Sequence, residues 1–315
     1  MKKLAAKSVY NRIGWYFCVL EVVIQFVATL ILLACMVIDE KAINNTDVLM
    51  IASDISYHVV GFPIFILCIS TLDGKAKSPK LKLSIGQFIT LFFISFAVMN
   101  VANLFNIAFQ QGFQLVTGRE LGSALDDVMI APTFITILSS VVLAPIVEEY
   151  TFRYFAFNKL RKYGDKAAIL ITSLLFGLFH GNFEQFIYAA AIGLVFGYVV
   201  SKTGCVWYSI GLHMLVNLCG GIVPLIVEQI NNSYVTLLFT IVSYVMILIG
   251  IIMFALNMKK VHLELGSELV KYPVKTALCN PGMLVFIIFS FMLMLFSLIS
   301  QISSVFFDTM AYNVY

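Results

Sequence analysis

The sequence predicts an all-α, polytopic membrane protein with a helical bundle of about nine transmembrane helices. Of its 315 residues, 61% are hydrophobic and only 12% are charged, and the mean hydropathy is +0.96. Ordinary soluble domains carry roughly 25% charged residues, so a soluble fold of this length could not cover so much apolar surface. The apolar residues also come in long runs, and the basic residues gather between alternate runs. These three observations exclude a soluble enzyme, a disordered chain and a nucleic-acid-binding protein.

Each predicted transmembrane helix is an apolar run of about 20 residues, the length that crosses a bilayer core of about 30 Å. The predicted spans are 15–38, 48–71, 84–110, 133–157, 167–184, 186–202, 205–227, 234–257 and 282–303. The fifth and sixth are short and adjacent, so the number falls to eight if one of them is re-entrant. No polar stretch is long enough for a separate soluble domain. We therefore expect residues 1–315 to form a single integral membrane domain.

The positions of the lysines and arginines predict the orientation, because cytosolic loops carry an excess of these residues. Seventeen of the 20 fall before the first span or after the second, fourth, sixth and eighth, namely Lys2, Lys3, Lys7, Arg12, Lys75, Lys77, Lys80, Lys82, Lys159, Arg161, Lys162, Lys166, Lys202, Lys259, Lys260, Lys271 and Lys275. The alternate connections hold only Lys41 and Arg119. This pattern predicts a cytosolic N-terminus and an extracellular C-terminus, and it favours nine spans over eight.

Polar residues concentrate in three of the predicted spans, where each ionisable side chain is costly and calls for a role. The fourth span ends in Glu148-Glu149-Tyr150-Thr151-Phe152-Arg153, the fifth contains Phe176-Gly177-Leu178-Phe179-His180, and the seventh contains His213-Met214-Leu215-Val216-Asn217. Three pairs of these residues are four positions apart and therefore share a helix face. At such a spacing Glu149 and Arg153 can form an ion pair, which leaves Glu148 free to face another direction.

The depths of these residues in the membrane are similar at about 1.5 Å of rise per residue. Glu148 and His213 lie eight or nine residues from the predicted cytosolic ends of their spans, at about 14 Å. His180 lies deeper, at about 20 Å. One carboxylate, two imidazoles and the amide of Asn217 are therefore expected to line one cavity near the membrane midplane.

This set of side chains can hydrolyse an amide without a covalent intermediate. A glutamate removed from water holds a proton more readily, so Glu148 is suited to accept a proton from water. An imidazole can orient that water, and a second imidazole and an amide N–H can stabilise an oxyanion. Glu148, His180 and His213 could instead bind zinc, which would activate the water. The H-E-x-x-H arrangement of common zinc proteases is absent from the sequence.

Other polar or helix-perturbing residues have plainer interpretations. Pro145 cannot donate to the helix ladder, and a kink there would aim Glu148. Asp54 and His58 are spaced for a local pair in the second span, which is favoured over a second polar site. Gly193 and Gly197 form a small-x-x-x-small face, which is typical of helix packing.

The three polar segments resemble the intramembrane proteases of the CPBP (CAAX protease and bacteriocin-processing, or Abi) family, which include type II CAAX prenyl endopeptidases and self-immunity proteins. The family pattern is E-E-x-x-x-R, then F-x-x-x-H, then H-x-x-x-N. Glu148-Glu149 with Arg153, Phe176 with His180, and His213 with Asn217 match it in order and spacing. The resemblance covers about residues 133–220, the expected catalytic core.

By this resemblance, Glu148 and His180 would activate the attacking water, and His213 and Asn217 would stabilise the oxyanion. Glu149, Arg153 and Phe176 would support the site. Bacterial members are often called metalloproteases, so the resemblance leaves a zinc cofactor open.

The leading hypothesis is therefore an intramembrane endopeptidase acting on a membrane-associated peptide or protein, in the lipid bilayer of a bacterial plasma membrane. One alternative is a non-catalytic immunity or peptide-binding protein that captures a partner in the same cavity. Another is a proton-coupled transporter, which inverted repeats would favour; the sequence shows no convincing repeat. The sequence predicts no nucleic-acid partner, and it leaves the oligomeric state open.

Overall fold

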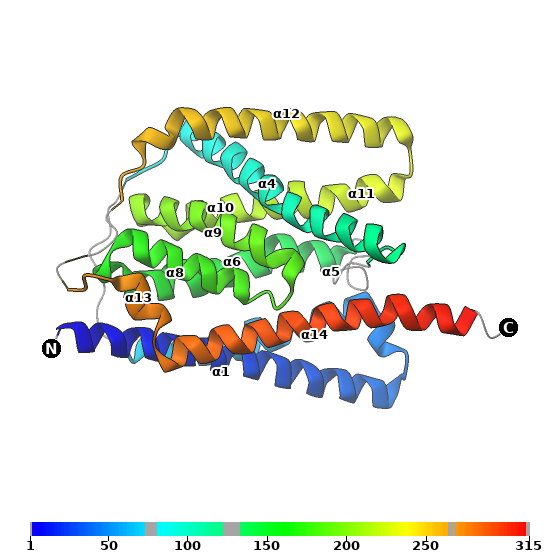
Figure 1. Ribbon diagram of the computed structural model, residues 1–315, viewed down its shortest axis with the longest axis horizontal. Coiled ribbons are helices and arrows are strands. Elements are labelled where there is room, and N and C mark those ends of the chain that lie inside the picture. Colours follow the sequence, from blue (N-terminus) through cyan, green and yellow to red (C-terminus); the bar gives the residue numbers. More distant parts are fainter. Residues whose placement is uncertain (1, 73–80, 122–132, 264–266, 268, 313–315) are drawn as a thin grey trace.

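The computed structural model describes residues 2–72, 81–121, 133–263, 267 and 269–312. In this part the chain forms long helices that run between two ends of the molecule, with α1 beginning at one end and α14 finishing at the other (Figure 1). The longer helices are α1 (Lys2–Ile38), α4 (Ile85–Thr117), α8 (Asp165–Leu178), α9 (Phe183–Thr203), α12 (Ser233–Asn257) and α14 (Pro281–Tyr312). The expectation of an all-α membrane protein is confirmed.

Three further passes are built from several helical segments without a break. The pass Thr46–Ser70 joins α2 (Thr46–Asp54), η2 (Ile55–Gly61) and α3 (Phe62–Ser70). The pass Phe134–Tyr163 joins α5 (Phe134–Ile137), η3 (Leu138–Leu143), α6 (Ala144–Glu149), η4 (Tyr150–Phe157), α7 (Asn158–Leu160) and η5 (Arg161–Tyr163). The pass Val206–Ile230 joins α10 (Val206–Asn217), η6 (Leu218–Ile222) and α11 (Val223–Ile230). The short segments η1 (Ala42–Asn44), η7 (Met258–Lys260) and α13 (Pro273–Leu278) lie near the ends of longer helices.

Eight helices in the described part are long and apolar enough to cross a membrane. The ninth pass is α8, which has only 14 residues and is about 21 Å long. The predicted fifth span, 167–184, is therefore too long at its C-terminal side. Because α8 leads from one end of the molecule and α9 returns to that end (Figure 1), α8 and the eight longer helices together give nine passes in the described part of the chain.

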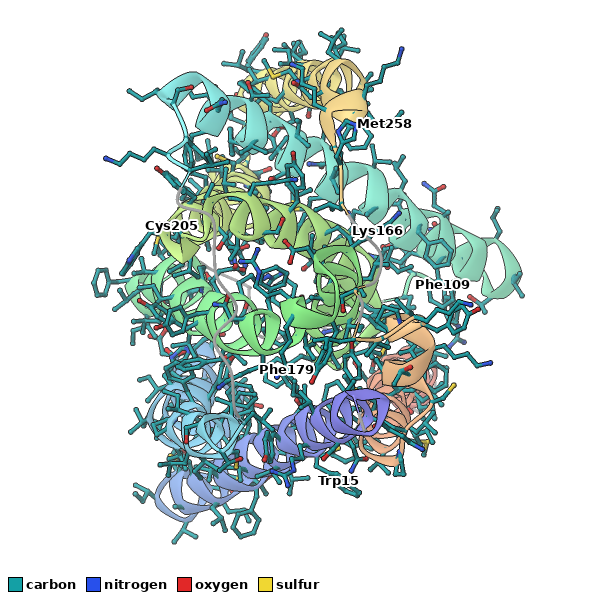
Figure 2. The ribbon with its side chains drawn as sticks, turned by 90° about the vertical axis from the view of Figure 1, so that its left-hand side faces the viewer. Trp15, Phe109, Lys166, Phe179, Cys205 and Met258 are labelled. Carbon is teal, nitrogen blue, oxygen red and sulfur yellow. The ribbon has the colours of Figure 1, made fainter. Side chains whose placement is uncertain are left out.

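The passes form three layers, with α6, α8, α9 and α10 in the middle (Figure 1). Helices α1 and α14 pack together on one side of this central group, next to α2 and α3. Helix α4 crosses the other side diagonally and carries α12 on its outer surface. Figure 2, viewed along the helices, shows the central group enclosed between these two outer layers. Large apolar side chains of α12 point outward, as expected of a helix that faces lipid.

The basic residues gather at the end of the molecule where α1 begins. The segment η5, the start of α8, the end of α9, η7 and α13 all lie at this end and carry lysine or arginine (Figure 1). Lys41 follows the opposite end of α1, and Arg119 follows the opposite end of α4. Lys75, Lys77 and Lys80, also predicted on the basic side, lie outside the described residues.

Three of the composite passes contain a π-helical turn directly before a proline. The segments η2, η3 and η6 are each followed by one residue and then by Pro63, Pro145 or Pro224. In each case the N–H of the residue before the proline donates to a carbonyl five positions back. Because proline has no N–H, the carbonyl five positions before each proline receives no such bond. The kink predicted at Pro145 therefore takes the form of a widened helical turn.

A cluster of phenylalanine rings joins the outer helices to the central group. Phe17 of α1 lies 5.1 Å from Phe152, 5.0 Å from Phe65 and 5.5 Å from Phe286, measured between ring centroids. Phe152 lies 5.5 Å from Phe179, which follows α8. All but Phe179 are fully buried. Helices α1, α3 and α14, which lie outside residues 133–220, thus share one aromatic cluster with the segments that carry the polar motifs.

Candidate functional site

Glu149 and Arg153 form a fully buried ion pair at the centre of the bundle. Arg153 Nη1 lies 3.0 Å from Glu149 Oε1, and both side chains have 0% exposure. The guanidinium carbon of Arg153 also lies 4.3 Å from the centroid of Phe176 and 5.7 Å from that of Phe196. A buried charge is tolerated only when it is paired, so these contacts explain how Arg153 is held among apolar helices.

Gly193 makes room for the Arg153 guanidinium. A Cβ atom at position 193 would lie 2.9 Å from Arg153 Nη2 and 3.1 Å from the Cβ of Ser173. Gly193 belongs to α9, one turn before Gly197. Its absence of a side chain therefore does more than allow two helices to pack, because it creates the space in which the ion pair forms.

His213 lies between the two glutamates. Its Nδ1 is 3.2 Å from Glu149 Oε1, and its Nε2 is 3.7 Å from Glu148 Oε2. The ring packs against Phe176 and Phe196, with centroids 5.7 and 5.2 Å away. The exposed fraction is 4% for the His213 side chain and 14% for Glu148. Glu149 thus orients both Arg153 and His213, while Glu148 keeps an open side.

His180 lies in the turn after α8 and not within a helix as predicted. The helix ends because Gly181 has a left-handed backbone conformation with φ of 64°. The next residue, Asn182, caps α9 by accepting a bond of 2.8 Å from the N–H of Gln185. His180 Nδ1 is 2.8 Å from the carbonyl oxygen of Phe176. Since a carbonyl can only accept, Nδ1 carries the proton and Nε2 presents its lone pair in the neutral ring.

Asn217 bonds to the helix that carries the glutamates. Its Nδ2 donates to the backbone carbonyl of Ser140 over 2.8 Å. An amide nitrogen carries two N–H groups, so one remains for another acceptor. Motif residues from three separate passes therefore lie around one region, although His180 makes no direct ion pair with Glu148 among the described contacts.

Tyr57 reaches this region from the second pass, outside the motif segments. Its hydroxyl donates to Thr151 Oγ1 over 3.3 Å, and its ring centroid lies 5.3 Å from that of Phe179. Tyr57 is buried. Tyr57 was not predicted from the sequence, because a tyrosine in an apolar run carries no local signal of a long-range contact. The neighbouring Asp54 accepts a bond of 2.7 Å from Ser139 Oγ, and it also lies 3.4 Å from His58 as the spacing predicted.

The residues named as zinc ligands do not form a zinc site in the structure. In the described part of the chain, no three His, Cys, Asp or Glu side chains are grouped to hold a metal ion. A catalytic zinc takes three protein ligands at about 2.0–2.2 Å. Glu148 and His213 lie near each other, and the bond from His180 Nδ1 to the Phe176 carbonyl leaves Nε2 available, but His180 is not grouped with them closely enough for the three to hold one ion.

Comparisons with known proteins agree with the resemblance noted in the sequence. Residues 130–219 match the family model described as type II CAAX prenyl endopeptidase Rce1-like. A Bacillus subtilis (strain 168) protein named "Putative membrane peptidase YdiL" is 26% identical over 217 residues, which cover 64% of this chain and 85% of that protein. No solved structure gives a significant match. The predicted family resemblance is confirmed, and a membrane protease is supported at family level.

Proposed function

From the premise that residues 130–219 form an Rce1-like region, we propose that the chain is an intramembrane endopeptidase. It would hydrolyse a peptide bond of a membrane-associated peptide or protein by a water molecule activated by side chains. The observation that carries this proposal is the position of His213 between the buried Glu149 and the more open Glu148. A purely structural ion pair would need only Glu149 and Arg153.

Glu148 is the proposed general base. Its carboxylate accepts a proton from water while the water oxygen attacks the carbonyl carbon of the substrate. The Nε2 lone pair of His180 accepts a hydrogen bond from the second O–H of the water and so orients its oxygen, because Nδ1 is committed to the Phe176 carbonyl; this second hydrogen stays on the oxygen and ends on the carboxyl product. Glu148 then gives its proton to the leaving nitrogen as the C–N bond breaks, which balances the reaction.

His213 and Asn217 are the proposed donors to the developing oxyanion. Glu149 accepts a hydrogen bond from His213 Nδ1–H and fixes the plane of the ring, as the carboxylate does in a serine protease triad. The Nε2 atom points to the side where Glu148 lies, and an Nε2–H there would donate a hydrogen bond to the oxyanion. Asn217 contributes the N–H that is not bonded to Ser140. Preorganised donors of this kind each contribute about 10²–10³ in rate.

The orientation of the protein in its membrane follows from the basic end of the bundle. We place the end with η5, η7 and α13 on the cytosolic side, because short cytosolic loops are enriched in lysine and arginine. With nine passes this puts the C-terminus outside the cell, and the host membrane is proposed to be a bacterial plasma membrane.

The test is cleavage of a mixed peptide library by the purified, detergent-solubilised protein, read by mass spectrometry. Glu148→Gln should lower the cleavage rate by at least about 10²-fold, because it removes the base. Glu228→Gln is the matched control, since Glu228 is exposed on α11. Full activity of Glu148→Gln would refute the mechanism, and a peptide bound but never cleaved would favour the immunity or peptide-binding alternative.

A second arm of the assay addresses metal. We expect cleavage to survive removal of divalent metal by a chelator, because the described His, Cys, Asp and Glu side chains do not form a three-ligand cluster. Loss of cleavage that added zinc restores, with no other divalent ion active, would overturn the mechanism based on side chains alone.

A further inference from the structure

The hydrogen bond from Asn217 to Ser140 depends on the proline that follows η3. In this π-helical turn the Ala144 N–H donates to the Ser139 carbonyl, five residues back. The next bond of that series would run from residue 145 to the carbonyl of Ser140. Residue 145 is proline and has no N–H, so the Ser140 carbonyl is left without a donor in its own helix.

Asn217 supplies the missing donor from α10. Its Nδ2 lies 2.8 Å from the Ser140 oxygen, which is a normal hydrogen-bond length. An unpaired carbonyl is costly inside a membrane protein, so this bond satisfies a group that the proline has exposed. The bond also consumes one of the two N–H groups of Asn217 and fixes the plane of the amide.

We propose that Pro145 is a positioning residue that orients Asn217 by leaving the Ser140 carbonyl free to hold it. This inference rests on the proposed function, in which the second N–H of Asn217 faces the substrate. When the first N–H of Asn217 is bonded to the Ser140 carbonyl, the amide cannot rotate, and the second N–H points in one fixed direction. The residue that sets this direction lies three positions before Glu148, so the proton acceptor and the oxyanion donor are positioned by the same helical turn.

Pro145→Ala is the direct perturbation, because alanine restores an N–H that can donate to the Ser140 carbonyl. Asn217 would then compete with a main-chain donor. Pro63→Ala is the matched control, since Pro63 follows the π-helical turn η2 in the same way and lies outside the motif segments.

The first measurement does not involve activity. Unfolding of the full chain in mild detergent is followed for Asn217→Leu, Pro145→Ala and the double variant. Asn217→Leu should raise the unfolding equilibrium constant by about threefold in the native background, the average effect of an interhelical bond in a membrane. In the Pro145→Ala background the same change should have no effect. Equal effects in the two backgrounds would overturn the proposal.

The second measurement is the cleavage rate. Pro145→Ala should lower kcat by about tenfold with KM unchanged, since a misplaced donor weakens the transition state and not ground-state binding. Adding Asn217→Leu to Pro145→Ala should give the rate of Asn217→Leu alone, and Pro63→Ala should leave kcat unchanged. Native kcat in Pro145→Ala would overturn the inference while leaving the base role of Glu148 intact.

The outcomes separate the two proposals. Full cleavage by Glu148→Gln refutes the proposed function, whereas the stability cycle still reports whether Pro145 controls the Asn217 bond. If Pro145→Ala fails to accumulate, the proposal is tested by Asn217→Leu in the native background. An unchanged unfolding constant would show that the bond to Ser140 contributes nothing, and would overturn the proposal.

Discussion

Replacing Gly193 with alanine should displace Arg153 from its ion pair. The new Cβ would lie 2.9 Å from Arg153 Nη2 and 3.2 Å from the Cα of Ser173, which is shorter than normal van der Waals contact. Arg153 cannot move away easily, because it is fully buried between the Phe176 ring and Glu149. Overpacking of this kind costs about 1–3 kcal/mol.

The helical preference of alanine partly offsets this cost. Alanine is favoured over glycine by about 1 kcal/mol in a helix interior, so the net loss for Gly193→Ala is about 0–2 kcal/mol. Gly197→Ala is the control on the same helix, where the new Cβ would lie 3.1 Å from Ile169 Cγ2. Its neighbours are apolar atoms of one isoleucine, so we expect a net change within about 0.5 kcal/mol.

Two assays measure these effects. Unfolding in mild detergent gives the difference in stability between the two alanine variants, and peptide cleavage shows whether the displaced Arg153 also disturbs Glu149 and His213. Arg153→Lys provides the double-mutant cycle, because lysine lacks the Nη2 atom that meets the new Cβ. A Gly193→Ala variant as stable and as active as Gly197→Ala would contradict this prediction. So would a stability loss from Gly193→Ala that is the same in the Arg153→Lys background as in the native background.

Three further predictions concern the ion pair, the second pass and the orientation. Arg153→Met should destabilise the fold by about 3–5 kcal/mol, because it leaves Glu149 buried without its cation, and adding Glu149→Gln should recover part of that loss in the same unfolding assay. Tyr57→Phe should cost about 0.5–1.5 kcal/mol by removing the bond to Thr151, and it should add nothing to Thr151→Ala. A variant retaining only the exposed Cys279 should resist a membrane-impermeant thiol reagent in intact cells and react in inside-out vesicles; labelling of intact cells would reverse the proposed orientation.

Contacts within one helix were predictable from spacing. The pairs Glu149–Arg153 and Asp54–His58 are four residues apart, and both form as expected. The similar depths calculated for Glu148 and His213 also agree with their separation of 3.7 Å. Helical periodicity and rise per residue are local properties, so a single sequence contains enough information to place these residues relative to one another.

Contacts between distant segments were not predictable in the same way. Nothing near Tyr57 in the sequence indicates Thr151 as its partner, since 94 positions separate them. The role of Gly193 was not predicted, because a glycine that makes room for a side chain and a glycine that lets two helices pack closely have the same appearance in a sequence. The end of α8 could have been predicted from the sequence. Gly181 and the capping residue Asn182 together indicate a helix break before residue 184.

The pairing of α1 with α14 has a consequence for biogenesis. Gly14 of α1 lies directly against Gly282 and Met283 at the start of α14, and the Gly282 N–H donates to Asn11 Oδ1 over 2.7 Å. The inner face of α1 is therefore covered only after α14 has been synthesised. Contacts between segments so far apart in sequence form late. Until α14 has been synthesised, the phenylalanine cluster around Phe17 lacks Phe286. During that interval we expect the nascent protein to be most susceptible to cellular quality control.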